Sequence, residues 1–120
     1  MILFFICLCL IFAISKFQNS VKKFDIDLKI AYKGLAVINT SVKCSKDINE
    51  IKMKSILQKK INSKWEKVKE WNKLEKESSI SIKKTSTINV GYTYRVISLI
   101  EIKKGNDTKM YKKISSEKFY

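Results

Sequence analysis

Apolar and polar residues alternate along much of this 120-residue chain, and this period of two is the feature that most limits the folds open to it. Such a pattern places one set of side chains on the core face of a β-sheet and the other set on the solvent face. Phe24, Ile26, Leu28 and Ile30 begin the pattern, with polar residues between them. They predict a half-buried strand that ends in a turn at residues 32–34.

Further runs with the same period predict more strands. Two of them cover residues 36–44 and 50–59, and the others lie within residues 80–90, 92–103 and 110–114. The chain contains no proline, and few helix-start signals interrupt these runs. The pattern predicts an all-β fold, an immunoglobulin-like antiparallel sandwich of about seven strands, in a single domain over residues 21–120.

The segment from residue 64 to residue 77 fits two structures. Trp65, Val68, Trp71 and Leu74 recur every three residues, which would place them on roughly one stripe of a helix. In a strand, Trp65 and Trp71 would share one face and Val68 would take the other, unless a β-bulge shifts the register. The local pattern leaves helix and strand open.

The chain begins with an uncharged apolar segment, and the first charged side chain is that of Lys16. Its run of about fourteen hydrophobic residues is too short for a helix to span a ~30 Å hydrocarbon core but fits a secretory signal. We expect a signal peptide over residues 1–15, or at most to residue 20, and a protein that is secreted or held at the cell envelope. A retained membrane anchor is the alternative.

The net charge of +14 rests almost entirely on lysine, because Arg95 is the only arginine. Proteins that read phosphates or base edges specifically favour the planar fork of arginine, whereas lysine is a hydrated point charge. The charge therefore predicts loose attraction to polyanions and no specific nucleic acid. The expected partners are anionic envelope polymers, such as teichoic acids, or a protein.

The residue types argue against an enzyme. The chain has no histidine, and Cys44 is the only cysteine beyond the predicted signal peptide. Without a neighbouring base or a second soft ligand, Cys44 is best interpreted as a buried structural thiol. Asp25 and Asp27 lie on the polar face of a strand and are interpreted as solvated side chains. We expect no catalytic residue, no metal site and no cofactor.

Three segments of the chain are distinctive. They are Leu57-Gln58-Lys59-Lys60 followed by Trp65-x-x-Val68-x-x-Trp71, then Gly91-Tyr92-Thr93-Tyr94-Arg95-Val96, and then Ser115-Ser116-x-x-x-x-Tyr120. Together they resemble a family of small exported proteins of unknown function from low-GC Gram-positive bacteria. The resemblance covers residues 26–120 and carries no established activity or ligand. It implies an immunoglobulin- or fibronectin-III-like β-sandwich and favours a strand for residues 64–77.

The resemblance also implies structural roles for three residues. In immunoglobulin-like sandwiches, a tyrosine near the start of the sixth strand ties the chain to a loop through its hydroxyl, two residues before a core position. Tyr94 and Val96 match these two positions. Cys44 would then occupy the opposite core position, facing Val96.

Two groups of apolar residues are candidate binding sites. Ile97 and Leu99 point away from the core face of their strand, as Ile56 does on the third strand, and the three would form a surface strip joined by Tyr111. The alternative is that lysine stems cover this strip.

Trp65 and Trp71 would either fill the core or form an outward aromatic platform. Taken together, the sequence predicts a non-enzymatic binding or structural module of the bacterial cell envelope. The alternative is a secreted cationic effector that acts on the membranes of other cells.

Overall fold

The computed structural model describes residues 17–120, and the predicted signal peptide lies outside this range. Within this range there is no helix long and apolar enough to cross a membrane. The described residues form eight strands: β1 (Val21–Ala31), β2 (Leu35–Cys44), β3 (Glu50–Ile61), β4 (Lys64–Glu75), β5 (Ser79–Thr87), β6 (Thr93–Lys104), β7 (Asp107–Ile114) and β8 (Lys118–Phe119).

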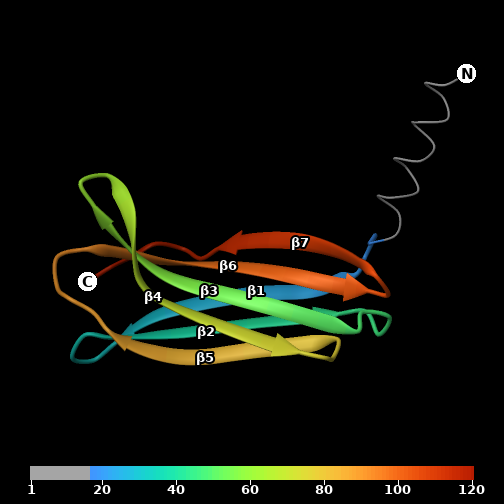
Figure 1. Cartoon of the computed structure of the whole chain (residues 1–120). Coiled ribbons are helices and arrows are strands. Elements are labelled where there is room, and N and C mark those ends of the chain that lie inside the picture. The colour runs from blue at the N-terminus through green and yellow to red at the C-terminus, as the bar shows by residue number, and fades with distance from the viewer. Residues whose placement is uncertain (1–16) are drawn as a thin grey trace, which may run out of the picture.

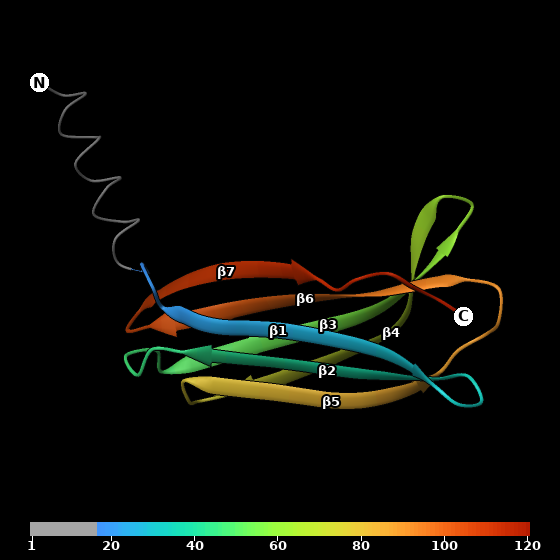
Figure 2. The same ribbon diagram turned by 180° about the vertical axis from the view of Figure 1, so that it is seen from behind.

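The strands form two antiparallel sheets that pack face to face (Figure 1). The smaller sheet has the order β1-β2-β5 and lies in front in Figure 2. The larger sheet has the order β4-β3-β6-β7, and the short strand β8 also pairs with β6. This arrangement confirms the predicted antiparallel sandwich. Strand β4 belongs to the sheet of β3, β6 and β7, whereas in constant-type immunoglobulin domains the fourth strand joins the other sheet.

The buried side chains of the sandwich form two apolar clusters in opposite halves of the core. The first cluster draws its side chains from the C-terminal half of β2 and the end of β6, among other elements. The second includes Tyr94, which lies near the start of β6. The first consists of Phe17, Val42, Cys44, Ile48, Ile51, Met53, Ile80, Ile82, Ile100 and Ile102. The second consists of Leu28, Ala36, Ile38, Leu57, Ile88, Tyr94 and Val96.

A small polar group separates the two clusters. The hydroxyl oxygen of Ser98 in β6 lies 2.9 Å from that of Ser55 in β3 and 3.3 Å from that of Thr40 in β2. All three residues are buried, and the contact with Thr40 joins the two sheets. These hydrogen bonds keep the hydroxyls paired where water cannot reach them, which offsets the cost of burying polar groups.

Lysine side chains bridge the two sheets at both open edges. The Lys73 ammonium of β4 donates to the carbonyl oxygen of Ser81 in β5 at 2.8 Å. At the other edge, the Lys113 ammonium of β7 donates to the carbonyl oxygen of Phe24 in β1. Charged side chains at sheet edges also discourage pairing with another chain.

Residues 64–75 form strand β4, so the strand alternative holds. The pairing of β4 with β3 shifts register between Leu57 and Gln58, and Val68 is the extra residue on the β4 side of this bulge. Asn62 and Ser63 make the tight turn between β3 and β4, both with positive φ. Beyond the bulge, the tip of this hairpin bends away from the sheets near the start of β6 (Figure 1). Bulges increase local twist, which accounts for the bend.

The structure supports the role implied for Tyr94 and contradicts the one implied for Cys44. The Tyr94 hydroxyl donates to the carbonyl oxygen of Asn89 at 2.9 Å and accepts from the Asn89 amide at 3.0 Å, so it does tie β6 to the preceding loop. The expectation that Cys44 faces Val96 is wrong. Cys44 ends β2 in the first cluster, whereas Val96 lies near the start of β6 in the second.

Candidate binding face on the larger sheet

The outer faces of the two sheets differ in chemistry. On the smaller sheet, the outward residues of β1 include both acids and lysines, and they pair along the strand. Lys23 lies 3.3 Å from Asp25, and Lys29 lies 3.5 Å from Asp27. Serine, threonine and asparagine occupy most of the outward positions of β2 and β5. This face is polar and its charges are partly balanced.

Cations dominate the outer face of the larger sheet. Residues that pair directly across neighbouring strands point to the same side, so the register of β4, β3, β6 and β7 defines this face. Its cationic side chains are those of Lys52, Lys54, Lys60, Lys67, Arg95, Lys103 and Lys112. Its carboxylates are those of Glu50, Glu70 and Glu101. The face therefore carries a net positive charge, although one of its lysines, Lys67, lies 3.7 Å from Glu70.

An apolar strip runs through these cations. Ile56 of β3 pairs with Ile97 of β6, and Ile97 pairs with Ile114 of β7. The neighbouring positions add Leu99, and Met110 and Leu74 lie farther along the same face. The strip thus consists of Ile56, Ile97, Leu99, Met110 and Ile114, and Leu74 lies apart from it, beyond Lys52.

The exposed apolar residues of this face are not those that the sequence pattern singled out. Met110 is 61% exposed, Leu74 47% and Ile114 43%, whereas Ile97 is only 9% exposed because its neighbours on both sides cover it. Alternation within one strand shows that a residue points outward. It does not show which strands lie beside it, so Leu74, Met110 and Ile114 were missed.

Tyr111 does not belong to the strip. It pairs with Ile100, which is fully buried in the core, and it packs against the first cluster. The prediction that it joins Ile97 and Leu99 is wrong because the register of β7 turns it toward the smaller sheet. Met110 and Lys112 take the outward positions on either side.

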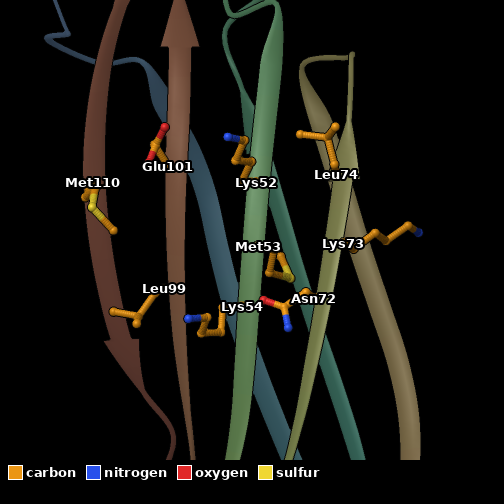
Figure 3. Close-up of a pocket in the computed structure, with 9 residues that line it drawn as sticks. All are labelled: Lys52, Met53, Lys54, Asn72, Lys73, Leu74, Leu99, Glu101 and Met110. Atoms are coloured by element: carbon orange, nitrogen blue, oxygen red, sulfur yellow. The ribbon is translucent and has the colours of Figure 1, made fainter.

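A shallow groove of about 520 Å³ crosses one end of this face. Leu99 and Met110 lie on one side of it and Leu74 on the other, with Lys52 and Lys54 between them (Figure 3). The carboxylate of Glu101 also lines the groove, which therefore combines apolar walls with one carboxylate and an excess of ammonium groups. A ligand that matches it carries negative charge beside apolar surface.

The bulge in β4 places the two tryptophans in different surroundings. Trp71 pairs with the buried Ser55 and packs against the second core cluster, as does Val68. Trp65 pairs with Lys60 on the outer face. The structure does not bring the two indoles together, so the platform made of both does not form.

Trp65 instead belongs to a group of side chains around Arg95. The guanidinium carbon of Arg95 lies 4.1 Å from the centroid of the Trp65 ring, and the Lys60 ammonium lies 5.7 Å from that centroid. Arg95 also donates from Nε to Oε1 of Gln58 at 2.8 Å. A second pair makes the same kind of contact, since the Lys59 ammonium lies 4.5 Å from the ring centroid of Tyr92. Each contact is within the range of a cation–π interaction.

Cys44 is the described residue with a nucleophilic thiol. Burial raises the pKa of its thiol to about 11, and the nearby Asp47 carboxylate adds to the shift. The thiol is therefore protonated at neutral pH, and its sulfur lies inside the first cluster. In residues 17–120, no group of three or more histidine, cysteine, aspartate or glutamate side chains is placed to hold a metal ion.

The structure gathers the three segments on which the family resemblance depends. Gln58 contacts Arg95, Ser115 Oγ accepts from the Val96 amide at 2.8 Å, and the Tyr120 amide donates to the carbonyl oxygen of Tyr92 at 3.1 Å. No protein-family model and no curated protein matches the chain. The resemblance therefore stays a prediction.

Proposed function

We propose that this chain is an exported, non-enzymatic binding module of the bacterial cell envelope. It holds anionic envelope polymers, such as teichoic acids, on the outer face of its larger sheet. The observation that carries the proposal is the difference between the two outer faces. The larger sheet presents a clear excess of cations over carboxylates around an apolar strip, whereas the smaller sheet presents a polar surface with a smaller excess of lysine.

Two forces would act together on such a ligand. Lysines attract a polyanion over a distance set by the Debye length, which falls from ~30 Å at 0.01 M salt to ~8 Å at 0.15 M. The apolar strip and the groove beside Leu99 and Met110 add a contribution that salt does not screen. Binding that persists at physiological salt therefore depends on the face and not on net charge alone.

A pair of triple variants tests the proposal. Lys52→Gln, Lys54→Gln and Lys112→Gln remove three exposed charges from the outer face of the larger sheet. Lys29→Gln, Lys43→Gln and Lys83→Gln remove three exposed charges from the smaller sheet and leave the same net charge. We expect the first variant, and not the second, to lose affinity for purified lipoteichoic acid at 0.15 M salt, as measured by calorimetry.

Equal losses in the two variants would contradict the proposal, because they would mean that the whole surface attracts the polymer through net charge. A second experiment tests for membrane activity with vesicles of anionic lipid that contain a dye. Release of an entrapped dye at the protein concentrations that bind polymer would favour the secreted cationic effector instead.

A further inference from the structure

Arg95 differs from the other cations of the chain in how firmly it is held. It is the only arginine beside 24 lysines, and it is partly buried on the outer face of β6. Trp65 covers one face of its guanidinium at 4.1 Å, and Gln58 accepts from its Nε at 2.8 Å. Two independent contacts thus fix both the plane and the rotation of the group.

These contacts leave one edge of the guanidinium for a ligand. Gln58 occupies Nε, which blocks the side edge formed by Nε and one terminal nitrogen. The end edge carries Nη1 and Nη2, whose parallel N–H groups match two oxygens of one oxyanion. In residues 17–120, neither terminal nitrogen meets a carboxylate within 4.0 Å or donates to another side chain.

A second cation contacts the same indole ring. Lys60 and Arg95 are both within 6 Å of the centroid of the Trp65 ring, and no carboxylate of the described residues lies within 4.0 Å of the Lys60 ammonium. An oxyanion at the end edge of the guanidinium would gain two charge-assisted hydrogen bonds from an arginine that is already oriented.

We propose that Arg95 is the specificity residue of the binding face and holds the two non-bridging oxygens of a phosphodiester group through Nη1 and Nη2. Lys60 adds positive charge near the same indole, and Trp65 and Gln58 are positioning residues. This inference rests on the proposed function, since it names the chemical group that the face recognises. A carboxylate presents the same pair of oxygens, and the experiment separates the two.

The single arginine makes the test direct. Its Nε–H gives one side-chain signal in a ¹H–¹⁵N NMR spectrum, so no assignment by mutagenesis is needed. We would titrate the protein in 0.15 M NaCl with glycerol phosphate oligomers, with poly-glutamate and with additional NaCl. We expect the Arg95 signal to shift and saturate with the phosphodiester oligomers only. An equal response to poly-glutamate, or no response beyond that to NaCl, would overturn the proposal.

Three variants separate the geometry of the arginine from its charge. Arg95→Lys keeps the charge and removes the fork, and we expect it to weaken oligomer binding by about tenfold. Lys112→Gln removes a charge from the same face and keeps the fork, and we expect a much smaller loss. Gln58→Glu places a carboxylate against the guanidinium and should weaken binding as Arg95→Lys does.

The outcomes distinguish the role of Arg95 from the proposed binding of anionic polymers by the face. If Arg95→Lys binds as the wild type does while the triple variant of Lys52, Lys54 and Lys112 fails to bind, the face is a binding site and the role of Arg95 is refuted. If neither variant changes binding, both proposals fail. Circular dichroism of each variant confirms that the fold is retained.

Discussion

At the scale of single residues, the hydroxyl of Tyr94 links the start of β6 to the loop before it through two hydrogen bonds to Asn89. Tyr94→Phe removes both bonds and leaves the backbone groups of Asn89 without these partners. We expect the free energy of unfolding in urea to fall by about 1–2 kcal/mol. Tyr111→Phe is the matched control, and its effect should be smaller. Equal losses in the two variants would mean that the hydroxyl contributes nothing specific.

Cys44 makes stability depend on pH in the alkaline range. Burial raises the pKa of its thiol from 9.0 to about 11, so the folded protein keeps a proton that the unfolded chain releases. The unfolded state therefore gains stability between pH 9 and 11, and the free energy of unfolding should fall over this range and then level off. Cys44→Ala should remove that part of the pH dependence. A variant with the same pH slope as the wild type would contradict this assignment.

At the scale of elements, the period of two was enough to predict the strands, because each strand buries one face against the core. Residues 64–75 remained ambiguous from local pattern, since a recurrence of apolar residues every three positions fits a helix and fits a strand only with a bulge, here at Val68. The bulge depends on pairing with β3, which the sequence of β4 alone does not contain.

The candidate site could be predicted only in part, for the same reason. Alternation showed that Ile56, Ile97 and Leu99 point away from the core. The register across the β6–β7 turn decides that Met110 points outward and Tyr111 inward, and that register is a property of two strands together. The contact of Trp65 with Arg95 joins residues 30 positions apart and left no local signal.

The turn between β3 and β4 offers a prediction about one element. Asn62 and Ser63 have φ values of 50° and 65°, the left-handed conformation that tight hairpin turns require and that serine adopts at a cost. Ser63→Gly should raise the free energy of unfolding by about 0.5–1 kcal/mol. The same change at Ser79 within β5 should lower it. Destabilisation by Ser63→Gly in thermal or urea unfolding would contradict the turn assignment.

At the scale of the whole molecule, the core extends to a residue that precedes the predicted domain. Phe17 is buried in the first cluster, and the Ser45 amide donates to the carbonyl oxygen of Ser20 at 2.8 Å. A chain that starts at Lys16 keeps these contacts, and a chain that starts at Val21 loses them. We expect the shorter chain to be less stable by about 1.5–3 kcal/mol, the value of burying one large apolar side chain. Equal urea midpoints would show that Phe17 adds nothing to the core.

The central claim is that one face of the sandwich binds anionic polymer and the other does not. The most direct test is to map backbone amide shifts in the NMR spectrum of the wild-type protein during titration with lipoteichoic acid at 0.15 M salt. The account predicts shifts concentrated in β3, β6 and β7 and around Trp65 and Arg95, with β1, β2 and β5 little changed. Shifts spread evenly over the lysines of both sheets would contradict it.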